Sequence, residues 1–161
     1  MPSRRIVNAS PLILLTKAGH LDLLRFGGVS VVVPDAVVAE VGAKGRQDPT
    51  ALAIEPVGWL RVVPAPEAPE PVRACHLDRG ESAVLALAHG DPECEVVLDD
   101  LAGRRCAARL GIPCLGTLGV VLAAKRLGTI PAARPVIERL RLAGLYLDDE
   151  WVEEVLKRVG E

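Results

Sequence analysis

The stretch EVVLDDLAGRR, from Glu95 to Arg105, decides the fold. It joins a short apolar run, typical of a buried strand, to two adjacent carboxylates at Asp99 and Asp100, and two arginines follow closely. Neighbouring carboxylates repel each other, so the pair needs a structural or chemical reason. Two interpretations stay open at this point: a helix N-cap, or oxygen ligands for a metal ion.

Strand-like and helix-like segments alternate on both sides of this stretch. The sequence predicts strands over 5–7, 29–33, 59–63, 94–98 and 113–116. It predicts helices over 11–19, 21–28, 34–45, 80–90, 102–111, 117–128, 135–144 and 148–161, and one more short helix before the strand at 59–63. Ser10 is expected to cap the helix that starts at Pro11. A polar turn over 44–50 and an extended, proline-rich crossover over 64–72 complete the chain.

This alternation, with short connections, predicts the fold class. We expect a single domain over residues 1–161, an α/β fold of three α/β/α layers with a central, mainly parallel sheet. A dinucleotide-binding site would require GxGxxG after the first strand, and VNASPL lacks it. No P-loop is present either.

The charge of the chain is close to balanced but unevenly distributed. A formal net charge of -2 gives no overall attraction to nucleic acid. Between Leu101 and Leu147, however, there are eight basic residues, and the only acid is Glu138. This predicts a basic wall, provided that the fold gathers those residues on one face.

The cysteines and the apolar runs bear on the location of the protein. Cys75, Cys94, Cys106 and Cys114 form no CxxC pair and no zinc-type spacing with histidine, so we expect plain thiols in a reducing cytosol. No signal peptide is visible, and no run reaches the roughly 18 apolar residues of a membrane span. We therefore expect a soluble, cytoplasmic protein with no membrane partner.

Amides are almost absent from the sequence. Asn8 is the only asparagine and Gln47 the only glutamine, and arginine far outnumbers lysine. This composition is typical of a heat-adapted, thermophile protein, in which thermolabile amides are avoided. The asparagine that remains therefore needs a reason.

Oxygen-bearing side chains follow two of the predicted strands, and others lie in two of the predicted helices. All of them can reach the same edge of the sheet. In open α/β sheets, ligands bind at the carboxyl ends of the parallel strands. If the strands over 5–7 and 94–98 are neighbours, these side chains meet at one edge. A set of oxygen donors with no soft ligand suits Mg²⁺ or Mn²⁺ rather than zinc. The candidates are Asn8, Ser10, Glu40, Glu81, Asp99 and Asp100.

Several motifs in order resemble a known family. They read VNASPLILL, VPDAVVAEV, RGESAVLALA and LDDLAGRRCAARLGIPCLGTLGVVLAAKRLGTI, and together they cover almost the whole chain. The sequence is similar to the PIN-domain superfamily of metal-dependent ribonucleases, and more closely to a prokaryotic PIN-like branch related to toxin ribonucleases.

The resemblance implies roles for individual residues. The acidic positions of the family fall on Asn8, Glu40, Glu81 and Asp100, with Asp99 beside the last. In the family these residues hold one or two metal ions, which activate a water and stabilise the leaving oxygen of a phosphodiester. Ser10 matches a small hydroxyl residue near the site. The RNA-binding set would be Ser10, Arg104, Arg105 and Arg109.

Asn8 departs from the family pattern, since the usual residue there is a carboxylate. Its amide oxygen can bind a hard cation but adds no charge, and it cannot act as a base. The side chain could equally cap the helix that follows. The sequence leaves these two interpretations open.

Two functions follow from the sequence. The first is a metal-dependent RNA endonuclease, the toxin of a toxin–antitoxin pair, with an antitoxin protein as partner and a homodimer as the expected assembly. The alternative is a catalytically silent PIN-like module that binds RNA or a protein partner.

Overall fold

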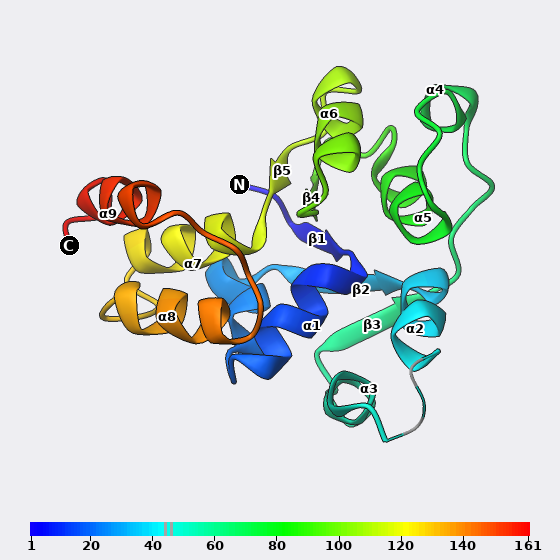
Figure 1. Ribbon diagram of the computed structural model, residues 1–161. Helices are drawn as coiled ribbons and strands as arrows, with labels where there is room; N and C mark the ends of the chain where they lie inside the picture. The colour runs from blue at the N-terminus through cyan, green and yellow to red at the C-terminus, as the bar shows by residue number, and fades with distance from the viewer. Residues whose placement is uncertain (44, 46) are drawn as a thin grey trace.

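The computed structural model of the protein describes residues 1–43, 45 and 47–161. Within these residues the strands form one sheet (Figure 1). Its order is β3-β2-β1-β4-β5, and every neighbouring pair is parallel. This confirms the predicted parallel sheet. The strands are β1 (Arg4–Val7), β2 (Ser30–Pro34), β3 (Leu60–Val63), β4 (Cys94–Val97) and β5 (Cys114–Leu115).

The strand order reverses at β1. The chain adds β2 and β3 on one side of β1, then returns to place β4 and β5 on the other. The carboxyl ends of β1 and β4 therefore flank a topological switch point, where open α/β sheets leave a crevice for ligands.

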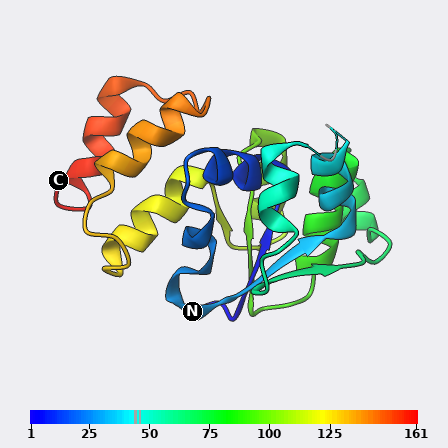
Figure 2. The ribbon, with the colours of Figure 1, turned by 90° about the horizontal axis from the view of Figure 1, so that it is seen from below.

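Helices cover both faces of the sheet. Figure 1 shows α5 and α6 on one side, and α1 with η1 on the other, which confirms the predicted three layers. Figure 2 shows α8 and α9 at one end of the molecule, next to α7. None of the helices in the described residues combines the length and the apolar character that a membrane crossing requires. The helices are α1 (Ala9–Lys17), the 3₁₀ helix η1 (Leu21–Gly28), α2 (Asp35–Gly42), α3 (Pro49–Ile54), α4 (Glu70–Arg73), α5 (Arg79–Ala88), α6 (Leu101–Arg109), α7 (Thr117–Arg126), α8 (Arg134–Leu142) and α9 (Asp149–Lys157).

The start of α1 differs from the prediction that Ser10 caps this helix. The helix begins at Ala9, and Asn8 takes the N-cap position. Pro11 fits inside the first turn because the N–H that it lacks would have no partner within the helix there. Ser10 is thereby free to point elsewhere, and its Oγ donates to Asp99 Oδ2 at 3.3 Å.

Two other segments differ from the sequence prediction. The predicted helix over 21–28 is a 3₁₀ helix that is interrupted at Phe26 and Gly27, where Gly27 has a φ of 76°. The predicted extended crossover over 64–72 ends in the short helix α4, with Pro71 in its first turn.

The predicted helix over 34–45 ends at Gly42, and the predicted polar turn over 44–50 includes residues 44 and 46, which lie outside the described residues.

A disulfide corrects the expectation of four plain thiols. Cys75, in the segment before α5, is bonded to Cys106 on α6, whereas Cys94 and Cys114 are free. Spacing could not reveal a pair that is 31 residues apart in the sequence. Disulfides are rare in the cytosol, although intracellular proteins of hyperthermophiles are an exception.

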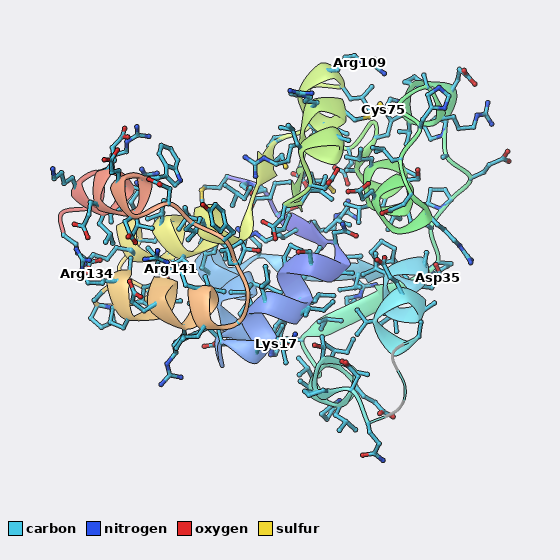
Figure 3. All side chains as sticks on the ribbon, viewed as in Figure 1. Lys17, Asp35, Cys75, Arg109, Arg134 and Arg141 are labelled. Atoms are coloured by element: carbon cyan, nitrogen blue, oxygen red, sulfur yellow. A yellow bond between two sulfur atoms is a disulfide. The ribbon has the colours of Figure 1, made fainter. Side chains whose placement is uncertain are left out.

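The predicted basic wall is broken at the C-terminal end. Arg134 and Arg141 project from α8 (Figure 3), but α9 neutralises both. Arg134 forms an ion pair with Glu153 at 2.7 Å, and Arg141 forms one with Asp149. These arginines connect two helices instead of forming a free cationic surface.

A buried ion pair joins the two central strands. Arg5 on β1 stands in register with Glu95 on β4, and only 1% of Arg5 is exposed. Its Nε donates to Glu95 Oε1 at 2.6 Å, and its Nη1 donates to the carbonyl of Leu24 at 2.6 Å. The guanidinium also lies 3.8 Å from the ring centre of Phe26. One side chain thus connects β1, β4 and η1.

Removal of the Glu95 carboxylate would leave the Arg5 charge buried without its partner. We expect Glu95→Ala to lower the free energy of unfolding by about 3–5 kcal/mol. Urea denaturation would measure this. Glu93→Ala, which removes an exposed carboxylate two residues away, serves as the control and should cost less than about 1 kcal/mol. Equal, small effects of the two variants would contradict the structural role of the pair.

Candidate metal centre

A pocket of about 500 Å³ lies at the carboxyl ends of β1 and β4. It contains every oxygen-bearing residue that the sequence singled out, and one that it did not, Asp78. The lining residues are Asn8, Ala9, Ser10, Glu40, Asp78, Glu81, Asp99 and Asp100.

The register of the two strands brings the residues together. Val7 at the end of β1 pairs with Val97 at the end of β4, and the backbone N–H of Asn8 donates to the carbonyl of Val97 at 3.1 Å. The residues that follow each strand must therefore leave the sheet side by side. This meets the condition on which the predicted site depended.

Asn8 is a buried residue of the pocket lining. It is 8% exposed, and its side chain makes no capping bond to α1 although it occupies the N-cap position. Within the described residues its Oδ1 accepts no hydrogen bond. A buried acceptor without a partner costs about 1–3 kcal/mol. The side-chain cap interpretation is therefore wrong, and the amide oxygen stays available to a ligand.

Three oxygen atoms face one small space beside Gly80. A Cβ at this position would lie 2.6 Å from Glu40 Oε2, 3.3 Å from Asn8 Oδ1 and 3.7 Å from Asp78 Oδ1. The space is open only because residue 80 has no side chain. At this space, α2, the end of β1 and the start of α5 meet.

Asp78 is the site residue that the sequence analysis missed. It is the N-cap of α5, and its Oδ1 accepts from the backbone N–H of Glu81 at 2.8 Å. The signal was the spacing of Asp78 and Glu81 in LDRGE, which is that of a helix capping box. A residue that caps a helix beside the crevice also presents its carboxylate to the crevice.

Glu81 has a strongly shifted acidity. The pKa of its carboxyl group is raised to about 7. Burial is the main cause, and the nearby carboxylates of Asp78 and Asp100 act in the same direction. A hydrogen bond with the Asp100 side chain acts in the same direction. In the metal-free protein Glu81 therefore holds or releases a proton close to neutral pH.

The adjacent aspartates serve two different helices. Asp100 caps α6 by accepting from the backbone N–H of Ala102 at 3.0 Å. Asp99 accepts from the backbone N–H of Thr117 at 2.7 Å and from its Oγ1 at 2.6 Å, at the start of α7. The helix-cap interpretation is therefore confirmed for Asp100. Both aspartates also line the pocket, and their role as metal ligands stays a prediction.

The three arginines of α6 lie in different surroundings. Arg104 Nη1 donates to the carbonyl of Leu98 at 3.2 Å, next to the pocket. Arg105 is exposed. Arg109 lies near the other end of the helix, where Figure 3 shows it close to Cys75, and its Nη2 donates to Cys75 Sγ at 3.1 Å. The predicted RNA-binding set is thus divided between the pocket and the disulfide.

The pocket suits a hard cation by the chemistry of its donors. Carboxylate, amide and hydroxyl oxygens surround it, and the free Asn8 oxygen and the space at Gly80 are the features that a small cation would use. Within the described residues, no group of three or more His, Cys, Asp or Glu side chains is close enough to hold an ion as it stands. The carboxylates of Asp78, Asp99 and Asp100 accept hydrogen bonds from backbone N–H groups at helix starts.

The family model described as DUF3368: PIN domain matches residues 4–161. No curated protein matches the sequence.

The raised pKa of Glu81 predicts how the stability of metal-free protein depends on pH. Between its ordinary pKa and about 7, the folded chain holds a proton that the unfolded chain has lost. The free energy of unfolding therefore falls as the pH rises through this range. Thermal denaturation in EDTA should show a lower melting temperature at about pH 8 than at about pH 5.5.

Glu81→Gln should flatten this dependence, since the amide does not titrate. Glu67→Gln, which changes an exposed carboxylate, is the matched control and should keep the wild-type slope. An unchanged slope in Glu81→Gln would assign the pH dependence to another group.

Proposed function

The chain belongs to the PIN-domain family, and from that premise we propose that it is a divalent-metal-dependent RNA endonuclease that hydrolyses phosphodiester bonds. PIN domains in general are metal-dependent nucleases. The observation that carries the proposal is the acidic pocket at the switch point, with the Asn8 Oδ1 in its lining that accepts no hydrogen bond within the described residues.

Six side chains would hold the metal, Mg²⁺ or Mn²⁺. When bound, such an ion supplies an activated water and stabilises the charge that develops on the leaving oxygen. Its ligands would come from Asn8, Glu40, Asp78, Glu81, Asp99 and Asp100.

The other steps fall to the residues of the chain. Glu40, Glu81, Asp99 and Asp100 are the carboxylates that would carry catalysis, and an ion bound among them would lower the pKa of Glu81 from the value of about 7 that burial gives it in the metal-free protein. Helix N–H groups fix Asp99 and Asp100, which keeps the acidic pocket in place while substrate binds. Arg104 and Arg105 would neutralise the phosphates next to the cleaved bond, because guanidinium groups pair well with phosphate oxygens. Arg109 is committed to Cys75 and is the weakest candidate of the three.

We further propose that the α8–α9 end binds a protein. Leu142 is 89% exposed, Tyr146 is 91% exposed and Trp151 is 42% exposed. Three large exposed apolar side chains within a stretch of ten residues favour a protein contact at this end of the molecule. The partners named by this proposal are a second copy, which gives a homodimer, or an antitoxin protein, which makes the chain the toxin of a cytoplasmic toxin–antitoxin pair.

The nuclease proposal is tested first by metal binding, because that needs no knowledge of the RNA target. Calorimetric titration of Mn²⁺ into metal-stripped protein should show saturable binding. Asp100→Asn should abolish the heat signal and slow Mn²⁺-dependent cleavage of RNA by roughly 100-fold or more, since it removes a charge from the pocket. Cleavage of a mixed RNA pool would be followed by gel.

Asp91→Asn is the matched control. Asp91 lies before β4, at the opposite end of that strand, where it pairs with Arg4. Its replacement should leave metal binding and cleavage unchanged. If Asp100→Asn cleaves RNA as fast as the wild type, the proposed mechanism is wrong.

The second candidate function, a silent module that binds RNA or protein, is favoured by one observation, the neutral amide at the first acidic position of the family. Asn8→Asp adds a negative charge beside Glu40 and Asp78, so we expect Mn²⁺ to bind at least about tenfold more tightly. Calorimetry measures the gain. If the wild type binds no metal while the variant binds metal and cleaves RNA, the silent module is established. If the variant gains no affinity, Asn8 does not face the ion.

A further inference from the structure

A second cavity, of about 330 Å³, lies between α6 and β5. Its lining combines two guanidinium groups with small apolar side chains and a thiol, and it shares no residue with the acidic pocket. The lining residues are Arg104, Arg105, Ala108, Ile112 and Cys114. This is the composition of a surface that holds a flat, weakly polar group next to a negative charge.

Gly116 brings the two cavities together. A Cβ at Gly116 would lie 2.6 Å from Arg104 Nη1 and 3.2 Å from Asp99 Oδ1. Arg104 lines the second cavity and Asp99 lines the acidic pocket. One guanidinium and one carboxylate therefore separate the two spaces, and a single ligand of modest length can enter both.

The arginines of the second cavity are available to a ligand. Arg104 and Arg105 are both exposed, and within the described residues neither forms an ion pair. By contrast, Arg134 and Arg141 are paired with carboxylates of α9. Two guanidinium groups that enter no ion pair of the described residues thus lie at this cavity, next to the acidic pocket.

Guanidinium planes stack on unpaired bases and also bind phosphates, whereas apolar side chains accept the face of a base. A base inside a duplex is stacked and paired, and cannot enter such a cavity without being flipped out. We propose that the cavity, here called the base subsite, holds one unstacked nucleobase next to the phosphodiester in the acidic pocket. The substrate is then a polynucleotide that is single-stranded at the cleaved position. This inference rests on the proposed function.

Cys114 provides a reporter inside the base subsite. It is a free and partly exposed thiol, whereas Cys94 is 2% exposed and the other two cysteines are joined in the disulfide. Alkylation by N-ethylmaleimide, followed by mass spectrometry, therefore measures access to Cys114. The probe is an eight-nucleotide polyuridine strand, on the wild-type protein with Ca²⁺ in place of Mg²⁺, so that the metal site can be filled while the strand stays intact.

The strand, at a concentration that saturates binding, should slow alkylation of Cys114 about tenfold. The same strand annealed to its complement, an abasic ribose-phosphate strand of equal length, and a polyglutamate peptide should give no protection. Equal protection by the abasic strand would mean that the cavity binds phosphate alone. Protection by the peptide would mean that it binds anions in general. Either result, or no protection by the polyuridine strand, would overturn the base subsite.

Ala108→Trp tests the subsite by filling it. Ala108 is exposed on α6, so the larger side chain enters the cavity without disturbing the core. Strand binding, measured by fluorescence anisotropy, should weaken about tenfold while Mn²⁺ affinity stays unchanged. Leu52→Trp, at an exposed position on α3, is the control and should change neither. Full strand affinity in Ala108→Trp would contradict the proposal.

The outcome separates the base subsite from the nuclease proposal. Protection of Cys114 without any cleavage by the wild-type protein would leave the subsite standing and remove the nuclease. Cleavage with no protection and no effect of Ala108→Trp would remove the subsite and leave the nuclease.

Discussion

The buried ion pair of Arg5 and Glu95 fixes the relationship between β1 and β4, on which the remainder of the structure depends. Removing two charges from water is costly, and the cost is tolerable only with the partners in register and their remaining donors satisfied. A shift of one strand by a single residue would separate the pair and turn its side chains to opposite faces of the sheet. The same register places Asn8 beside the residues that follow Leu98, so this interaction also sets the position of the acidic pocket.

The carboxylates of the pocket perform two tasks, and this explains how so much negative charge can gather there. Asp78, Asp99 and Asp100 each accept a hydrogen bond from the backbone N–H of a helix start. The positive end of a helix dipole favours a negative charge at this place. Three helix starts therefore stabilise the acidic pocket when it contains no cation. A backbone hydrogen bond at Asp78 also favours the charged form of Glu81, but burial outweighs it and raises the pKa of Glu81 to about 7.

The sequence predicted the features that depend on local pattern. The strands, most helices and the meeting of Asn8 with Asp99 and Asp100 followed from periodicity and from the rule that ligands bind at strand carboxyl ends. Features that depend on contacts between distant segments could not be predicted from the sequence. These are the disulfide of Cys75 and Cys106 and the ion pairs that engage some arginines and not others. Asp78 was missed for a different reason, because a helix cap is a sufficient explanation of an aspartate until its surroundings are known.

Arg5 and Glu95 are separated by 90 residues in the sequence, which has a consequence for the order of events during synthesis. Contacts between distant segments carry a large loop-closure cost and form slowly. A chain on the ribosome can assemble α1 and β2 early, but the central pair and the acidic pocket have to wait until β4 and the residues after it have been made. A truncated product that ends before β4 would therefore contain β1, β2 and β3 but lack Asp99 and Asp100 of the pocket. Whatever activity the site has is withheld until the chain has been made beyond Asp100.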